Sequence, residues 1–240
     1  MTAVGVGFDR SLRLEWLDLV AGMAQAGGQR REAQDRLRLW LRDRIEGEAA
    51  ARKTALVLAR TWYPVDPGLA RLREEALALI SSVGPSERLA VHWGLLLAVY
   101  PFFRDTAALT GRLLNLQQTF TASQLRQRLV ERYGDRAYVE RARRHVVLSL
   151  VYWGILEMVR RGGEYRRRAP LQVSEPSVER FLLHALLLAS SSDVALLEGL
   201  SSSAELFPFH LADDAARVVH DPRFSVSTVA GQQRLVSLVG

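Results

Sequence analysis

The sequence predicts a mainly α fold in three parts: a helical N-terminal domain (residues 1–100), a central unit of helices and a β-hairpin (101–173), and a small α+β region (174–240) that ends in a second β-hairpin. Apolar residues recur at helical spacing through most of the chain, which predicts the helices. Alternating apolar and polar residues are confined to two short stretches near 155–173 and 224–238, which predicts the hairpins. A chain of 240 residues that is 48% apolar can bury a sizeable core.

Glycines and prolines divide the first hundred residues into helices. The first helix ends at Gly27-Gly28, the second spans 29–47 with a broad apolar stripe, and the third stops before Pro64. Asp66 followed by Pro67 is typical of a helix N-terminus, so we expect a fourth helix from there.

The longest apolar run, LAVHWGLLLAVYPFF, spans residues 89–103. It is about one turn short of a membrane span and contains His92, so we expect a buried core helix that breaks at Pro101. The N-terminus lacks the basic and apolar regions of a signal peptide, and cysteine is absent. These features predict a soluble, cytoplasmic protein without disulfides or a membrane partner.

The middle of the chain has sharper local signals. Thr121 and Gln124 form a capping-box signature ahead of a helix over 122–133, which Gly134 ends. We expect Asp135 to cap the next helix, over about 136–156. That helix has a wet, basic outer side in its first half and is apolar nearly all round in its second half.

A short basic ribbon follows that helix. Residues 155–159 are expected to form one strand, 161–164 a turn, and 165–173 a return strand with Pro170 at its edge. The last seventy residues predict a helix after Pro176, a second short helix over 192–200, an irregular stretch, and a terminal hairpin of FSVSTV and RLVSLV.

The positive charge of the chain is local. The net charge is +6, and 31 of the 32 basic residues are arginines. Residues 121–170 hold twelve arginines against five acids, a net +7, so the other 190 residues sum to −1. A local patch of this kind favours a role in binding a polyanionic partner over a general role in keeping the protein soluble.

The order helix, capped helix, helix, hairpin in residues 103–173 resembles the winged helix-turn-helix superfamily. FTASQLRQRLVERYG stands as its second helix, DRAYVERARRHVVLSLVYWGIL as its third, and EMVRRGGEYRRRA as its wing. In that superfamily the third helix usually enters the DNA major groove and the wing touches the backbone or minor groove.

The resemblance implies DNA contacts for nine arginines. Arg136, Arg141 and Arg144 would face the duplex from the helix, and Arg143 lies more to the side, within reach of phosphate. The wing would supply the others: Arg160, Arg161, Arg166, Arg167 and Arg168. Because side chains alternate along a strand, Arg167 is expected on the opposite face from Arg166 and Arg168. The exposed half of the helix has no Asn or Gln, which favours general duplex contact over fine sequence reading.

A wider resemblance covers the order of most elements. A helical first half, then PFFRD, the winged segment, FLLHALLLAS, LLEGLSSSAELFPF and a terminal hairpin look like the BrxA-type accessory proteins of the bacterial BREX phage-defence systems. That resemblance implies DNA binding within a defence complex. The low positive charge of residues 174–240 departs from a second DNA-reading module.

Motifs that carry chemistry are absent from the sequence. There is no phosphate-binding glycine loop, no nucleophile elbow and no metal-binding histidine spacing. We expect His92 and His184 to be core residues with satisfied hydrogen bonds, and His145 to lie beside the basic patch within reach of phosphate. The sequence therefore predicts a protein that is not an enzyme and has no cofactor or metal.

Taken together, these patterns predict a non-catalytic protein that binds double-stranded DNA through a basic winged helix, as a defence-system accessory. Two alternatives stay open. The winged segment could contact other subunits of a complex as a protein-interaction scaffold, or the protein could regulate transcription. Exposed arginines on a helix can also be simply solvated.

Overall fold

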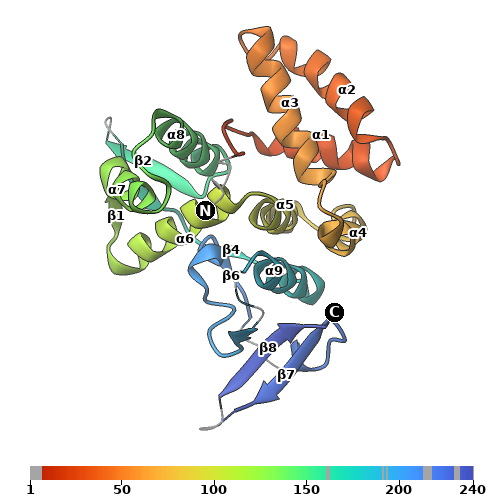
Figure 1. The fold of residues 1–240 in the computed structure, drawn as a ribbon, viewed down its shortest axis with the longest axis vertical. Coiled ribbons are helices and arrows are strands. Elements are labelled where there is room, and N and C mark those ends of the chain that lie inside the picture. Colours follow the sequence, from red (N-terminus) through yellow and green to blue (C-terminus); the bar gives the residue numbers. More distant parts are fainter. Residues whose placement is uncertain are drawn as a thin grey trace.

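The computed structural model describes residues 7–160, 163–190, 192, 194–212, 218–229 and 233–239. Its elements are arranged around a central pair of helices, with an N-terminal group of helices on one side and a helix and hairpin group on the other (Figure 1). A small C-terminal sheet lies below both groups in that view (Figure 1).

The N-terminal group and the helices that follow it have the bounds α1 (Leu14–Gln25), α2 (Arg30–Arg42), α3 (Glu48–Trp62), η1 (Pro67–Leu69), α4 (Ala70–Leu79), α5 (Pro85–Val99) and α6 (Pro101–Leu116). The Asp66 side chain accepts a hydrogen bond from the Gly68 backbone at 2.9 Å, so the expected cap is present, although it opens a 3₁₀ turn before α4. The apolar run breaks as predicted, because Pro101 is the first residue of a new helix.

The central unit follows the predicted order. It contains β1 (Thr119–Thr121), α7 (Ala122–Tyr133), α8 (Ala137–Tyr152), β2 (Leu156–Arg160) and β3 (Glu164–Arg167). The capping box is confirmed: the Gln124 backbone donates to Thr121 Oγ1 at 3.2 Å, and the Thr121 backbone donates to Gln124 Oε1 at 2.8 Å. The expected cap at Asp135 is wrong, because Arg136 is the N-cap residue and Asp135 accepts from Arg126 at 2.6 Å instead.

The hairpin is part of a three-stranded antiparallel sheet in the order β1-β3-β2. The sequence reasoning missed β1, which pairs along β3 and places Phe120 opposite Tyr165. These two buried rings stack with centroids 5.5 Å apart and join the sheet to the core. The return strand ends at Arg167, short of the predicted residue 173. Gly154 turns the chain from α8 into β2 with φ 72°, a conformation that favours glycine.

The last third of the chain has helical and extended parts. Its elements are β4 (Leu171–Gln172), α9 (Pro176–Ala189), β5 (Val194–Leu196), η2 (Ala204–Leu206), β6 (Phe209–His210), β7 (Phe224–Thr228) and β8 (Arg234–Leu238). The terminal hairpin of β7 and β8 is confirmed, and β4 pairs with β6 in parallel. The second short helix expected over 192–200 is wrong, because Val194–Leu196 pairs with β8 and its backbone groups are satisfied across strands.

The mainly α class predicted from the sequence is therefore wrong. Within the described residues, the strands form three small sheets beside the helices, and the chain from β4 onward is rich in strands. The fold is a mixture of α and β elements. Strands of two or three residues carry too little periodicity to appear in the sequence, and long-range pairing creates them.

One continuous hydrophobic core joins the N-terminal, central and C-terminal parts. Trp93 of α5 lies at its middle, with its ring against Phe103, Trp153, Phe207 and Phe209 at centroid distances of 5.0–6.3 Å. Its indole nitrogen donates to the Glu205 carbonyl at 2.9 Å. Trp93, from the N-terminal segment, thus packs against residues of the central and C-terminal segments.

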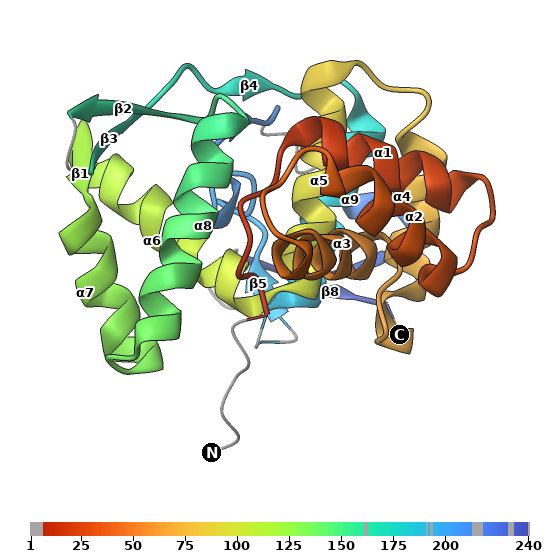
Figure 2. The ribbon, with the colours of Figure 1, turned by 90° about the horizontal axis from the view of Figure 1, so that it is seen from above.

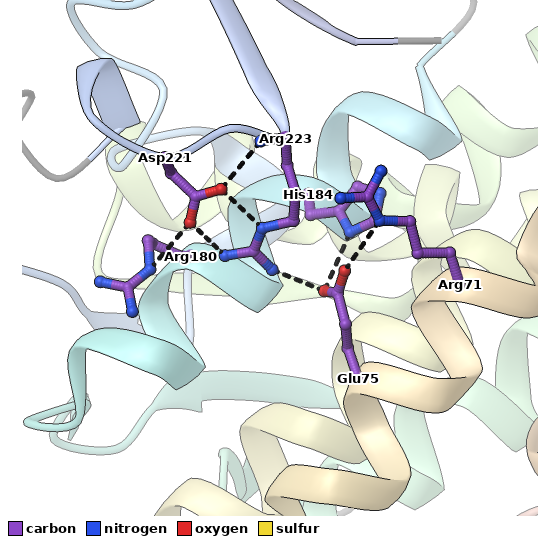
Figure 3. A network of polar contacts seen from close by, with 6 residues as sticks. All are labelled: Arg71, Glu75, Arg180, His184, Asp221 and Arg223. Atoms are coloured by element: carbon purple, nitrogen blue, oxygen red, sulfur yellow. Dashed lines mark hydrogen bonds and ion pairs between the residues drawn. The ribbon is translucent and has the colours of Figure 1, made fainter.

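A polar network fastens the C-terminal sheet to the helices (Figure 3). Arg223, just before β7, donates to Glu75 of α4 at 2.7 Å and to both carboxylate oxygens of Asp221 at 2.8 and 2.5 Å. From α9, His184 contacts Glu75 at 3.0 Å and Arg180 pairs with Asp221 at 3.1 Å. Three elements that are distant in the sequence are thereby held together.

Candidate nucleic-acid interface

The outer side of α8 presents the clearest basic surface. Arg141 and Arg144 are exposed and lie one turn apart, opposite the buried face of Val139, Ala142 and Val146. Within the described part of the chain, neither guanidinium pairs with a carboxylate. Their exposure confirms the placement that the helical periodicity predicted, and both guanidinium groups are open to solvent.

Arg136 lies at the N-terminus of the same helix and is also exposed. It donates to the Tyr138 hydroxyl at 3.0 Å, and its guanidinium lies 5.9 Å from that ring. These contacts hold the side chain near the start of α8 and leave most of its N–H groups unused.

Arg143 does not belong to this surface. It is only 5% exposed and donates two hydrogen bonds to Glu140, at 2.9 and 2.6 Å. These bonds lower the pKa of the Glu140 carboxyl, although partial burial opposes the shift. The expectation that Arg143 reaches phosphate is wrong, because its position on the helical wheel falls between the buried residues Val139 and Val147.

The hairpin arginines on the outer side of the sheet are exposed but paired. Arg166 and Arg168 share Glu157, the latter at 3.7 Å, and Arg160 lies 3.6 Å from Glu164. Such exposed pairs are weak and can exchange a carboxylate for a phosphate. The predicted site residue Arg161 lies outside the described residues.

Arg167 lies on the other face of β3, as the alternation predicted. Leu156 and Tyr165, which share that face, are buried, and the Arg167 guanidinium donates to the Phe207 carbonyl at 3.3 Å. This side chain points toward the C-terminal region and away from the outer side of the hairpin. The predicted alternation is therefore confirmed, and a DNA contact by Arg167 could not come from the face of the hairpin that presents Arg166 and Arg168.

The second half of α8 is covered by the chain that precedes α1 (Figure 2). Ser11 contacts His145 Nδ1 at 2.9 Å, the Leu12 backbone donates to Ser149 Oγ at 2.9 Å, and Arg13 lies 4.5 Å from the Tyr152 ring. The exposed arginines of the helix are consequently confined to residues 137–144, although Tyr152 near its end stays 46% exposed. Sequence reasoning missed this cover, because nothing local in residues 8–13 indicates where they lie.

His145 lies where these two parts of α8 meet. Its half-buried ring contacts Ser11, so its side chain is engaged within the protein as well as beside the basic patch. Burial lowers the pKa of His145, and the positive charges of Arg10, Arg144 and Arg141 lower it further. Arg10 is thus a basic neighbour of the α8 arginines that the sequence reasoning did not include.

Arg128 on α7 is a second residue missing from the predicted set. It is exposed, and among the residues that the structure describes it has no carboxylate partner. Its neighbour Arg126 is instead engaged with Asp135 at 2.6 Å. The local charge count of the sequence contained both residues, but it could not tell which one stays unpaired.

The other histidines serve the core. His92 accepts from the Trp62 indole at 3.2 Å and contacts Asp18 at 3.1 Å, and His184 contacts Glu75, so both are satisfied buried residues as predicted. No group of three potential metal ligands occurs among the described residues. Asp213 and Asp214, which follow His210 closely in the sequence, lie outside the described residues. The helices in the described part of the chain are all too short or too polar to cross a membrane.

Comparisons with known proteins found no match to this chain among protein-family models, curated proteins or solved structures. The resemblance to winged helices and to BrxA-type proteins therefore stays a prediction. Any function has to be argued from the geometry itself.

Proposed function

We propose that the protein is a non-catalytic, cytoplasmic DNA-binding protein in which residues 101–167 act as a winged helix-turn-helix. The observation that carries the proposal is the pair of exposed, unpaired arginines on α8, Arg141 and Arg144. They lie on a helix that follows a capped helix and precedes an arginine-bearing hairpin in a β1-β3-β2 sheet.

The chemistry of this surface suits phosphate. An arginine guanidinium is planar and donates parallel hydrogen bonds to two phosphate oxygens. The open half of α8, residues 137–144, carries Arg141 and Arg144 but no Asn or Gln that could read adenine. We therefore expect affinity that depends on salt and little preference for sequence.

The test removes the two α8 charges. Arg141→Ala with Arg144→Ala should weaken binding of a fluorescent 20–30-base-pair duplex and make the slope of log Kobs against log salt less negative by about 1.8, since each lost phosphate contact contributes about 0.9. Anisotropy titrations at several salt concentrations would measure both quantities.

The matched control removes the same charge elsewhere. Arg31 and Arg36 are exposed on α2, in the N-terminal group of helices on the opposite side of the molecule from α8 (Figure 1). Arg31→Ala with Arg36→Ala should leave the slope unchanged. Equal effects of the two double variants, or no binding by micromolar protein at about 50 mM salt, would contradict the proposal.

One observation favours a second candidate, a protein-interaction scaffold. Met158 and Val159 of β2 are 45% and 42% exposed, next to arginines that are already paired with Glu157 and Glu164. Exposed apolar side chains in a hairpin are typical of a protein contact. The scaffold function is favoured if the wild-type protein does not bind DNA but assembles with the co-expressed products of neighbouring genes. Met158→Ser with Val159→Ser should then abolish that assembly.

A further inference from the structure

We propose that a cavity behind the hairpin binds a small phosphate monoester of about the size of a nucleoside monophosphate. The cavity has a volume of about 370 Å³ and lies between the end of α6, the strand pair β4–β6, and the loop that leads into η2. It is separate from the α8 surface, and the inference does not depend on DNA binding.

The polar lining of the cavity consists of hydrogen-bond donors and potential cations. It comprises Asn115, Arg167, Ser201, Ser202, Ser203 and His210. Among the residues that the structure describes, no Asp or Glu lines the cavity, and the nearby Glu205 side chain lines a different cavity. An arginine, an imidazole, hydroxyls and an amide without a carboxylate form a surface that favours an anion.

Arg167 is the central residue of the site. Its neighbours Arg166 and Arg168 pair with Glu157, whereas the Arg167 side chain, as far as the described residues go, donates to the Phe207 carbonyl at 3.3 Å and to no other group. Within the described residues no carboxylate pairs with it. A guanidinium has five N–H donors, so a planar fork remains for the oxygens of a phosphate.

The wall of the cavity is closely packed. Gly111 of α6 packs so closely on η2 that a Cβ there would lie 2.2 Å from the Ala204 carbonyl oxygen. The Trp93 indole donates to the Glu205 carbonyl, and its ring packs on Phe207 and Phe209, which line the cavity. A preformed wall of this kind spares a ligand the entropy of ordering a loop.

The volume and shape select the class of ligand. Small-molecule sites fall at roughly 300–1,000 Å³, so this cavity has room for an organic group beside the phosphate. Phe207, Phe209 and Leu211 provide apolar surface for that group. A DNA phosphate offers the same anionic chemistry, but a duplex is too wide and stiff to enter a cavity of this size, which favours the small ligand.

The experiment is calorimetric titration of the full chain with adenosine 5′-monophosphate, inorganic phosphate and adenosine. Adenosine 5′-monophosphate should bind more tightly than phosphate, and adenosine should not bind. Arg167→Gln and His210→Gln should each weaken binding, the first by about tenfold or more, because a charged hydrogen-bond donor is lost. Arg166→Gln, on the opposite face of β3, should bind as the wild type does.

Separate controls test whether the variants fold and whether the bound phosphate belongs to a small molecule or to DNA. His210 is exposed, so its variant should keep the wild-type thermal midpoint even if Arg167→Gln unfolds. The inference is overturned by absence of saturable binding at about 10 mM ligand, by equal effects of the Arg166 and Arg167 variants, or by equal affinity for adenosine. Displacement of the nucleotide by a short duplex would assign the site to DNA phosphate, whatever the α8 variants show.

Discussion

Removal of the Arg223 guanidinium should detach the C-terminal sheet from the helices at a large cost in stability. We choose Arg223→Met, because methionine keeps an unbranched apolar side chain beside Phe224, whose ring centroid lies 5.6 Å from the Arg223 guanidinium carbon, while it removes the charge. The wild-type side chain is 15% exposed and donates three hydrogen bonds to carboxylate oxygens at 2.5–2.8 Å.

The loss of unfolding free energy depends on the contacts that the Glu75 and Asp221 carboxylates retain in the variant. Glu75 still contacts His184, and Asp221 still pairs with Arg180 at 3.1 Å, so neither is left without a partner. A hydrogen bond to a charged group contributes about 1.5–3 kcal/mol, and the loss of three with partial compensation should cost about 2–4 kcal/mol of unfolding free energy. For a chain of this length that lowers Tm by about 5–15 °C.

The cost should also depend on pH. The hydrogen bond from Arg223 lowers the pKa of Asp221 to about 2, and the hydrogen bond from His184 and the neighbouring charges lower the pKa of Glu75 in spite of its burial. A carboxyl with a lowered pKa contributes stability above its unfolded pKa, and this is lost as pH falls through the folded value. The difference in unfolding free energy between variant and wild type should therefore have its maximum value at pH 6 and shrink between about pH 4.5 and 2.

Chemical and thermal unfolding followed by circular dichroism would measure the difference. The control is Arg234→Met, which breaks the exposed ion pair of Arg234 with Glu198 in the same sheet and should change the midpoint little. If Arg223→Met unfolds at the same midpoint as Arg234→Met, or if its cost does not depend on pH, the network is not what holds the sheet in place.

Three further predictions concern the helices around the basic surface. Burial and nearby arginines lower the pKa of His145, and a DNA phosphate bound to α8 should raise it again by offsetting those positive charges. DNA should therefore bind more tightly at pH 6 than at pH 8. Anisotropy titrations at the two pH values would measure this difference, and His145→Gln should remove it. Gly111→Ala should cost about 1–3 kcal/mol in denaturant titrations, because the new methyl meets the Ala204 backbone, whereas Gly22→Ala, with open space, should stabilise. Thr121→Ala should cost about 1 kcal/mol by removing the α7 cap, and Thr121→Ser should restore most of it.

The parts of the fold that follow from short-range signals could be predicted from the sequence. The capping box at Thr121 and Gln124 fixes the start of α7 within a few residues, and Gly134 fixes its end. The strand β1 has no such signal. Thr119–Thr121 becomes a strand because it pairs with β3, whose residues Glu164–Arg166 lie 43–47 positions further along the chain, so the mixed α and β class could not be predicted from local sequence.

The candidate site was predictable to the extent that periodicity determines exposure. Arg141 and Arg144 fall opposite the apolar stripe of α8 and are exposed, as expected. Arg143 is adjacent in sequence but lies toward the buried side of the helix, and Glu140 one turn earlier accepts its two hydrogen bonds. Which of several arginines finds a carboxylate depends on side-chain contacts that composition does not contain.

The cover over α8 accounts for the composition of that helix and sets the size of the interface. Beyond residue 146 the helix is apolar nearly all round, because the core packs on one side and residues 8–13 on the other. Only about two turns of the helix, residues 137–144, carry exposed arginines, and Arg141 and Arg144 alone would contact few phosphates of a duplex. Stable binding would therefore need phosphate contacts from α7, where Arg128 is unpaired among the described residues, and from hairpin arginines that release Glu157. Because each phosphate contact adds to the salt dependence of binding, the slope of log Kobs against log salt reports the number of arginines that contact DNA more directly than the affinity does.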